Sequence, residues 1–360
     1  MTQSWHWQRF RSSDQIGLSN CALNIEYLTR RRDYDSALNL INRTISNDLH
    51  LNDHLFKWYL RRQEKRIEDL KLRNLNTSNG RRLINVCYID FWPNFMAHTS
   101  EIHLFLQYCC GLPLTLVDDP EQADILICSC FGSKIYNIQN KCATRILYLG
   151  ESIKPCYCLY DYSLSHELNE FDGKNIYLPL WILRAFNYVE KDTADTSLFS
   201  TIKIGNSRRK DVCIIADNIT PERQQQINYI EASGLKVDIY GWNSNPIDNK
   251  KEVLSQYLFS LCPENKWQKG YVTEKMIDVL HAKTMPIYWG DTREQNFGSF
   301  SQLKFNEINS NQKQVALKVR QIRESMQYQY RPPINKECYD ITADKIKGKI
   351  EKIFTELFLV

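Results

Sequence analysis

The chain has 360 residues, of which 43% are hydrophobic and 12% aromatic, and it carries 46 Lys and Arg against 42 Asp and Glu. This composition excludes a disordered or fibrous protein, and the length favours two domains over one. The net charge of +4 is too small for a dedicated nucleic-acid binder. All of the excess lies early in the chain, because residues 1–80 carry 13 basic and 9 acidic side chains and the remainder carries 33 of each.

Residues 1–80 are predicted to form a polar helical extension, since their apolar side chains recur at helical spacing. Arg61, Arg62, Lys65 and Arg66 decorate one of these helices. A basic helix suits a peripheral contact with an anionic membrane or an acidic partner, but a solvated face on a packed helix gives the same pattern. The role of this extension therefore stays open.

From residue 82 the pattern changes to short apolar runs separated by helical stretches. Strands are expected at 83–91, 114–119, 123–131, 145–151 and 176–183, with a helix at 100–110. Strands that alternate with helices predict a parallel sheet covered on both faces. We expect a first Rossmann-like domain at 81–195, followed by a polar linker at 196–210.

The alternation then restarts and predicts a second Rossmann-like domain at 211–335. Its strands are expected at 211–217, 236–241, 257–262 and 285–290, and its helices at 221–233 and 272–282. Two open α/β sheets in tandem place a cleft between the domains, where ligands of such folds bind. The C-terminal segment 336–360 is expected to form an amphipathic helix, whose pattern is clearest from Asp344 onward, and to pack back across the domains.

The cysteines and the start of the chain favour a cytoplasmic protein with reduced thiols. The opening residues lack the apolar core of a signal peptide, and no window of 18 apolar residues follows. Cys128-x-Cys130 and Cys156-x-Cys158 could together form a zinc site, but single-residue spacing on or beside strands favours small packed side chains. The one Asp-x-Asp motif, residues 33–35, lies in the helical extension, so we interpret it as surface charge and predict no metal.

The densest group of chemically active residue types is Cys262 to Leu280. We expect a strand end, a polar loop, and a helix whose first turn holds Tyr271, Thr273, Glu274 and Lys275. Helix N-termini attract anions, so Lys275 would suit a diphosphate and Glu274 could accept hydrogen bonds from ribose hydroxyls. Residues that only favour the start of a helix, beside a solvated surface lysine, would give the same sequence pattern. The spacing alone does not decide between a diphosphate site and an ordinary helix start.

The run YLFSLCPENKWQKGYVTEKMIDVLHAKTMPIYWGD, residues 257–291, resembles the signature of glycosyltransferase family 10, the α-1,3/1,4-fucosyltransferases. That pattern is a strand, Glu-Asn, a spacer, Gly-Tyr-Val/Ile-Thr-Glu-Lys, a helix, and a strand with Pro-Ile/Val-x-x-Gly. RILYLGE, the segment from LYDYSLSHEL to LPLWIL, and the segment from PERQQQ to VDIYG resemble the family as well. The resemblance covers roughly residues 83–300 and leaves 1–80 unexplained.

The resemblance implies a GT-B fold and inverting transfer from GDP-fucose, with no further cofactor. It implies that Arg223 and Lys275 contact the donor pyrophosphate, that Asn265 and Tyr271 line the same pocket, that Glu274 holds the ribose, and that Glu151 is the general base. Charge builds on the departing diphosphate, so fixed cations are needed in the absence of a metal. The attacking hydroxyl must also lose a proton, which a carboxylate can accept.

The expected reaction is transfer of L-fucose to a hydroxyl of an N-acetylglucosamine-containing glycan, in α-1,3 or α-1,4 linkage. Phe91 and Trp92 follow the first strand, where one of them could stack on an acceptor sugar or simply pack in the core. Two alternatives stay open. One is a GT-B transferase for another nucleotide sugar, and the other is a non-catalytic glycan-binding or scaffolding protein. No nucleic-acid partner is expected.

Overall fold

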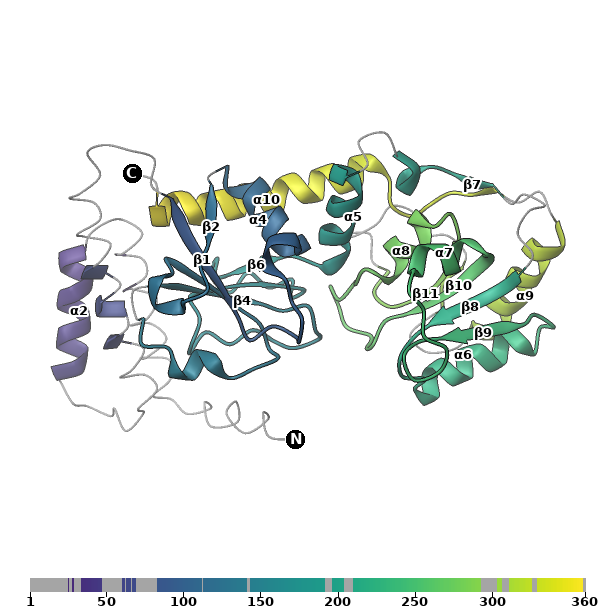
Figure 1. Cartoon of the computed structure of the whole chain (residues 1–360), viewed down its shortest axis with the longest axis horizontal. Coiled ribbons are helices and arrows are strands. Elements are labelled where there is room, and N and C mark those ends of the chain that lie inside the picture. Colours follow the sequence, from purple (N-terminus) through teal and green to yellow (C-terminus); the bar gives the residue numbers. More distant parts are fainter. Residues whose placement is uncertain are drawn as a thin grey trace.

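Two parallel sheets, each flanked by helices, form two domains that lie side by side along the longest axis of the molecule (Figure 1). The structure is a computed structural model. It describes residues 25, 28, 34–46, 60–61, 63–65, 67–68, 83–111, 113–140, 143–191, 196–203, 210–292, 303–305, 311–325 and 329–358.

The first domain contains a six-stranded parallel sheet in the order β2-β1-β3-β4-β5-β6. The strands are β1 (Ile84–Ile89), β2 (Leu114–Leu116), β3 (Ile125–Cys128), β4 (Thr144–Tyr148), β5 (Tyr162–Ser165) and β6 (Asn175–Tyr177). Its helices are α4 (Glu101–Cys110) and α5 (Leu180–Lys191), with short 3-10 turns η1 (Ala97–Thr99), η2 (Pro120–Gln122) and η3 (Lys134–Asn137). Strands β3, β4 and β5 are buried along their whole length, as expected for strands covered on both faces.

The second domain contains a four-stranded parallel sheet in the order β11-β10-β8-β9. The strands are β8 (Lys210–Ile215), β9 (Val237–Tyr240), β10 (Tyr257–Pro263) and β11 (Met285–Trp289). Its helices are α6 (Pro221–Glu231), α7 (Lys250–Ser255), α8 (Lys275–His281) and α9 (Gln312–Ser325). A 3-10 turn η4 (Thr196–Phe199) and an antiparallel pair, β7 (Ile202–Lys203) with β12 (Gln329–Tyr330), lie beside this sheet.

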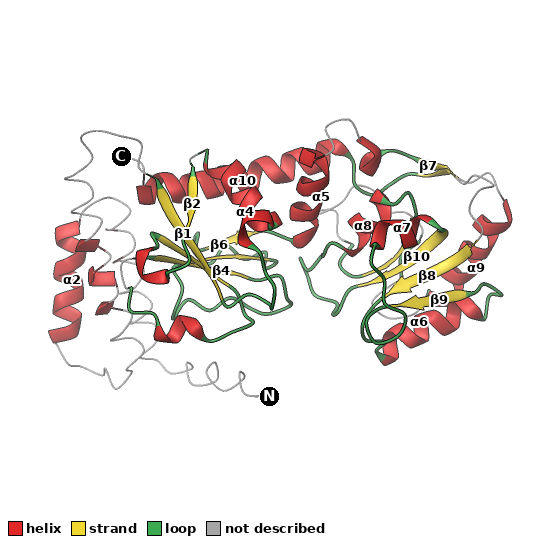
Figure 2. Cartoon of the chain, in the orientation of Figure 1, coloured by secondary structure: helices red, strands yellow, loops and turns green. Residues whose placement is uncertain are grey.

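The last helix, α10 (Lys336–Phe358), returns from the second domain and lies across α4, α5 and β6 of the first (Figure 2). The side chains of Ile346, Ile350, Ile353 and Leu357 are buried, so the apolar face expected for this segment packs on the protein. The helix begins at Lys336.

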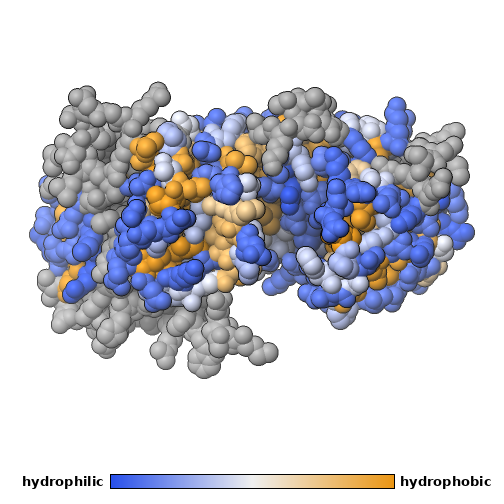
Figure 3. Space-filling view, in the orientation of Figure 1, coloured by the Kyte–Doolittle hydropathy of each residue, from blue (hydrophilic) through white to orange (hydrophobic). Residues whose placement is uncertain are grey.

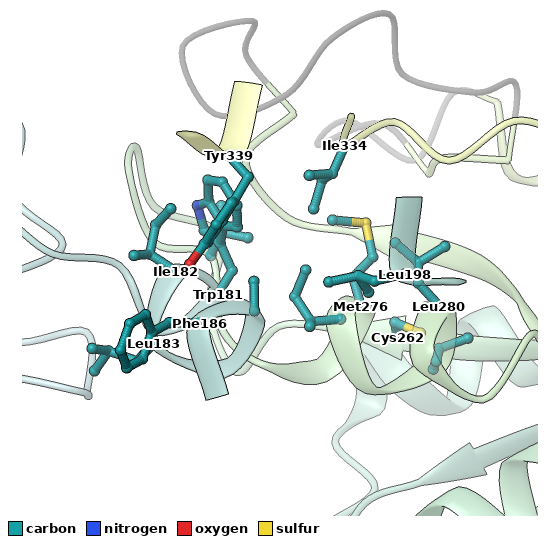
Figure 4. Packing of buried hydrophobic residues seen from close by; sticks show 14 of the residues in the cluster. Trp181, Ile182, Leu183, Phe186, Leu198, Cys262, Met276, Leu280, Ile334 and Tyr339 are labelled. Carbon is teal, nitrogen blue, oxygen red and sulfur yellow. The ribbon is translucent and has the colours of Figure 1, made fainter. Parts of the chain in front are cut away.

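One apolar cluster runs through both domains and joins them. Trp181 and Phe186 of α5, Met276 and Leu280 of α8, and Tyr339 of α10 belong to it (Figure 4). Because each of these side chains is at most 5% exposed, moving the domains apart would expose apolar surface. The two domains therefore share a core instead of meeting only through a polar cleft.

One expected element was wrong in type, and one strand was not expected. Leu180 to Leu183, expected to continue a strand, form the first turn of α5, because Pro179 ends the extended segment and the buried residues then follow helical spacing. Residues 162–165 form strand β5, which lies between β4 and the edge strand β6 and was not expected. Of the helical extension, α2 (Tyr34–Ser46) is described. The segment expected to be a linker, 196–210, contains η4 and β7, because Leu198 and Ile202 are buried in the core, and its residues 204–209 lie outside the described residues.

Candidate functional site

The strand order of the second sheet places a binding crevice between β8 and β10. The chain leaves β8 to form β9 on one side and then crosses to β10 on the other. Ligands of open α/β sheets bind at such a reversal, outside the carboxyl ends of the strands. The residues that follow those two ends include Asn218 after β8, and Glu264 and Asn265 after β10.

Arg223 and Asn265 are brought together at this point. Thr220 caps the N-terminus of α6 and places Arg223 in its first turn, where the residue is 7% exposed. Its guanidinium donates from Nη1 to the carbonyl oxygen of Asn218 at 2.6 Å and from Nη2 to Oδ1 of Asn265 at 2.9 Å. Burial lowers the pKa of Arg223, and nearby Glu264 opposes that effect. An arginine remains charged under such conditions, so the crevice contains a fixed cation.

Glu264 is a buried carboxylate whose importance the sequence analysis missed. It is 1% exposed and accepts hydrogen bonds from the Thr273 backbone N–H at 2.8 Å, the Thr273 hydroxyl at 2.6 Å and the Tyr288 hydroxyl at 3.1 Å. The Lys275 ammonium lies 3.2 Å from its Oε2. A charged residue directly after a buried strand at the sheet's reversal was the available signal. Glu264 thus ties the polar loop to the start of α8.

Lys275 is anchored but still reachable. Its Nζ donates to Glu264 and, at 2.9 Å, to the Thr273 hydroxyl, while its side chain keeps 21% of its surface exposed. Burial alone would lower the pKa of Lys275, but Glu264 and Glu274 raise it, so the ammonium stays charged. A third acceptor, such as a phosphate oxygen, would complete the three hydrogen bonds that an ammonium can donate.

The helix after this loop is shorter than expected. It spans seven residues and begins at Lys275, so Tyr271, Thr273 and Glu274 precede it, and the Glu274 side chain makes no capping hydrogen bond. Burial acts to raise the pKa of Glu274, but the cations of Lys275, Lys250 and Arg184 lower it overall. What this segment offers an anion is therefore the Lys275 cation and not the end of a long helix.

Tyr271 lies at the junction of the domains and not on the surface of the crevice. It is 2% exposed, and its ring meets the His166 ring of the first domain edge to face, with centroids 5.2 Å apart. Burial and the nearby Glu151 carboxylate raise the pKa of the Tyr271 hydroxyl, against the effect of a hydrogen bond from Asn265. The neutral phenol therefore connects the donor-side residue Asn265 with the neighbourhood of Glu151.

A cavity of about 460 Å³ lies between the domains and brings Glu151 and Glu274 to the same space. Glu151 comes three residues after the end of β4 in the first domain, and Glu274 comes from the second. Arg184 of α5 also lines the cavity, and it was missed because its helix was expected to be a strand. Its guanidinium lies 2.6 Å from Glu101 of α4 and 3.3 Å from Asp278 of α8. An ion-pair network therefore spans both domains beside the cavity.

The two aromatic candidates have different surroundings. The Phe91 ring stacks on Phe95 with centroids 4.0 Å apart and also lies parallel to Tyr148 at 5.9 Å, so it packs on the core. Trp92 is 43% exposed, lines the cavity, and meets Phe131 edge to face at 5.8 Å. Figure 3 shows a notch between the domains with apolar side chains gathered on its first-domain flank. Only Trp92 of the pair faces the cavity.

Within the described ranges, no three His, Cys, Asp or Glu side chains are placed to hold a metal ion. Cys128 is buried, and Cys130, Cys156 and Cys158 are partly buried. His103 is 4% exposed and hydrogen-bonds Tyr88. Of the Asp-x-Asp motif, Asp35 lies on α2 and residue 33 is outside the described part.

No helix in the described part of the chain combines the length and the apolar character needed to cross a bilayer. The cytoplasmic location expected from the sequence stays a prediction.

Models of known protein families match both of the domains that contribute residues to this site. Residues 86–184 match the family model described as the alpha-(1,3)-fucosyltransferase FucT N-terminal domain, and residues 205–330 match glycosyltransferase family 10 (fucosyltransferase) C-term. The first match includes Glu151 and Trp92, and the second includes Arg223 and the segment from Glu264 to Lys275.

Two curated proteins are similar over part of the chain. The alpha-(1,3)-fucosyltransferase FucT of Helicobacter pylori is 30% identical over 214 residues, which are 49% of this chain and 44% of that protein. The 4-galactosyl-N-acetylglucosaminide 3-alpha-L-fucosyltransferase 9 of Cricetulus griseus is 32% identical over 92 residues, 24% of this chain and 26% of that protein. The matches thus span less than half the length of these relatives.

Solved structures share the fold. A crystal structure of an alpha1,3-fucosyltransferase superposes with a TM-score of 0.57 at 20% identity, covering 78% of this chain and 92% of that one. The structure of an alpha1,3-fucosyltransferase with GDP-fucose gives a TM-score of 0.53 at 20% identity, with 76% and 92% coverage. The two domains of this chain therefore have the GT-B arrangement.

Proposed function

Because the chain belongs to glycosyltransferase family 10, we propose that it transfers L-fucose from GDP-fucose to a hydroxyl of an N-acetylglucosamine-containing glycan. The proposed linkage is α-1,3 or α-1,4, and the anomeric centre is inverted. One observation carries the proposal. A carboxylate from each domain, Glu151 and Glu274, faces the same interdomain cavity, and the cations Arg223 and Lys275 lie at the adjoining crevice of the second sheet.

The donor diphosphate is proposed to bind Arg223 and Lys275, with Glu274 on the ribose hydroxyls. When the bond from fucose to the diphosphate breaks, negative charge grows on the phosphate oxygens, and fixed cations stabilise it without rearranging. Arg223 is held by Asn218 and Asn265, and Lys275 by Glu264 and Thr273, so neither cation needs to be ordered at that moment. Tyr271 accepts a hydrogen bond from Asn265 and so helps to hold that side chain in place.

Glu151 is proposed to accept the proton of the attacking hydroxyl. An inverting transfer is a single displacement, so the nucleophile must approach the anomeric carbon from the face opposite the diphosphate. The carboxylate reaches the cavity from the first domain, whereas the cations belong to the second. That separation supports an arrangement in which the base and the leaving group lie on different sides of the sugar. A positioned base of this kind contributes about 10²- to 10⁴-fold to the rate.

Trp92 is proposed to carry the acceptor. A partly exposed indole at the cavity wall can stack on the apolar face of a pyranose ring. Its edge-to-face contacts with Phe95, at 5.0 Å, and with Phe131 hold the ring in place. Phe91 lies behind this group, stacked on Phe95, and supports it without facing the sugar.

The test is incubation with GDP-fucose and N-acetyllactosamine, with and without a chelator. We expect fucosylated product under both conditions, since Arg223 and Lys275 supply the positive charge. Glu151→Gln should lower turnover by about 10²-fold or more and leave the Kd for GDP within about twofold. Equal losses of turnover and GDP affinity would give Glu151 a structural role, and a strict need for a divalent cation would contradict the charge arrangement.

Arg223→Ala and Lys275→Ala should each weaken GDP binding about 10- to 100-fold, because each removes charge-assisted hydrogen bonds worth about 1.5–3 kcal/mol. Lys269→Ala is the matched control, because Lys269 is an exposed lysine in the polar loop between β10 and α8. It should leave the Kd for GDP unchanged. A panel of nucleotide sugars separates GDP-fucose from another donor, and stabilisation by GDP without any transfer would favour a non-catalytic binding protein.

A further inference from the structure

The polar loop at residues 264–274, here called the donor loop, is fastened to the first domain beside Glu151. Gln268 of this loop accepts a hydrogen bond from the hydroxyl of Ser152, which directly follows Glu151. Its amide nitrogen lies 2.9 Å from Nε2 of His166 and 3.0 Å from Oε1 of Glu167. One side chain from the second domain therefore joins two separate segments of the first.

The chemistry of the partners fixes the orientation of the Gln268 amide. Glu167 is a carboxylate that can only accept, so the amide nitrogen must point toward it, and the amide oxygen is then left for the Ser152 hydroxyl. His166 must accept at Nε2 and is therefore neutral. Burial lowers the pKa of His166 to about 4, which keeps the ring neutral at ordinary pH.

The backbone of the donor loop is also held in place by hydrogen bonds. The Gly270 N–H donates to the Asp291 carboxylate at 2.6 Å, and the Tyr177 hydroxyl of the first domain donates to the Gly270 carbonyl at 3.2 Å. Asp291 is 1% exposed, so its bond to the loop is shielded from water. The same loop carries Asn265, Tyr271 and Glu274. A shift of the loop would therefore move the donor-side residues and Gln268 together.

We propose that Gln268 is a positioning residue for the transfer reaction, which holds the Ser152 segment, and with it the Glu151 carboxylate, in register with the donor loop. This inference rests on the function proposed above. Gln268 contacts neither substrate in this scheme and acts through Ser152. The alternative is that Gln268 only strengthens the contact between the domains.

A double-mutant cycle with Ser152→Ala and Gln268→Ala separates these roles. If Gln268 acts through Ser152, each single variant and the double variant should lose the same factor in kcat, about tenfold, because the second change removes nothing further. The Kd for GDP should stay within about threefold. Ser152→Ala removes only one hydroxyl from a partly buried loop residue, so it keeps the test valid if Gln268→Ala folds poorly.

The pH profile supplies a readout that a purely structural contact would not move. The acid limb of kcat against pH reports ionisation of the base in the bound complex, so it should shift equally in Ser152→Ala and Gln268→Ala and stay in place in the control Lys269→Ala. An unchanged kcat in Ser152→Ala, or losses that multiply in the double variant, would overturn the proposal while leaving the proposed function intact. Absence of transfer by the unaltered protein would overturn both.

Discussion

Replacing Gly270 by alanine tests whether the donor loop is pressed against the first domain. Gly270 has a φ of +81°, and a Cβ added to it would lie 2.3 Å from the backbone oxygen of His166. A carbon and a carbonyl oxygen normally stay about 3.3 Å apart, so the loop would have to retreat by about 1 Å. Because the opposing atom belongs to the backbone, no side-chain rotation can relieve the contact.

The energetic cost has two sources. A left-handed conformation costs an alanine about 1–2 kcal/mol, offset by about 0.4–1 kcal/mol because alanine stiffens the unfolded chain. A retreat of about 1 Å would also weaken the hydrogen bonds from Gly270 to Asp291 and from Tyr177 to Gly270, worth about 1.5–3 and about 1 kcal/mol. We expect the free energy of unfolding to fall by about 2–4 kcal/mol. GDP affinity should fall too, because the loop carries Asn265.

Denaturant unfolding and GDP titration measure the two effects, and Gly111→Ala is the matched control. Gly111 also has a left-handed φ, +60°, but nothing lies within 4 Å of an added Cβ. It should therefore lose only the conformational cost, about 1 kcal/mol, and keep its GDP affinity. Equal destabilisation of the two variants, with GDP binding intact in both, would show that the donor loop does not rest on His166.

Two further predictions concern the same region. Lys283, just after α8, has a φ of +57° and donates an exposed hydrogen bond to Ser200. Because glycine adopts this backbone conformation more readily than lysine, Lys283→Gly should raise the free energy of unfolding by about 0.5 kcal/mol. A lower free energy of unfolding in a denaturant titration would contradict this. Burial lowers the pKa of His166 from 6.5 to about 4. Between these two pH values His166 is protonated in the unfolded chain and neutral in the folded chain. The free energy of unfolding should therefore fall by up to about 3 kcal/mol as the pH is lowered from 6.5 toward 4. His166→Gln should make the free energy of unfolding less dependent on pH over this range. An unchanged pH dependence in that variant would show that His166 is not the group responsible.

Most strands could be located from the sequence, because buried parallel strands are short apolar runs bounded by polar residues. The run at 176–183 failed because it contains two elements. Tyr177 ends a strand, Pro179 interrupts the extended backbone, and Trp181 begins to bury a helical face. A continuous apolar run has the same hydrophobicity in either state, so periodicity alone could not separate the elements.

The site was predictable where it follows from strand ends and motif positions, and not where it depends on contacts between distant segments. Glu151 and Glu274 line the interdomain cavity, and Arg223 lies at the crevice between β8 and β10, as expected from the strand ends. The contact between Gln268 and His166 joins residues 102 positions apart in the chain, and nothing local in a polar loop marks that partner. Phe91 and Trp92 could not be told apart either, because the choice depends on Phe95 and Tyr148 lying beneath one of them.

The balance of 33 basic and 33 acidic side chains beyond residue 80 says nothing about the local electrostatic potential of the site. The Lys275 charge is shared with Glu264. Arg223 differs, because its two hydrogen bonds go to uncharged oxygens of Asn218 and Asn265. Those bonds fix the guanidinium without pairing it directly with a carboxylate, although the charge of nearby Glu264 also acts on it. Arg223 is therefore the cation with more of its charge left for an incoming diphosphate, even though it is the more deeply buried of the two.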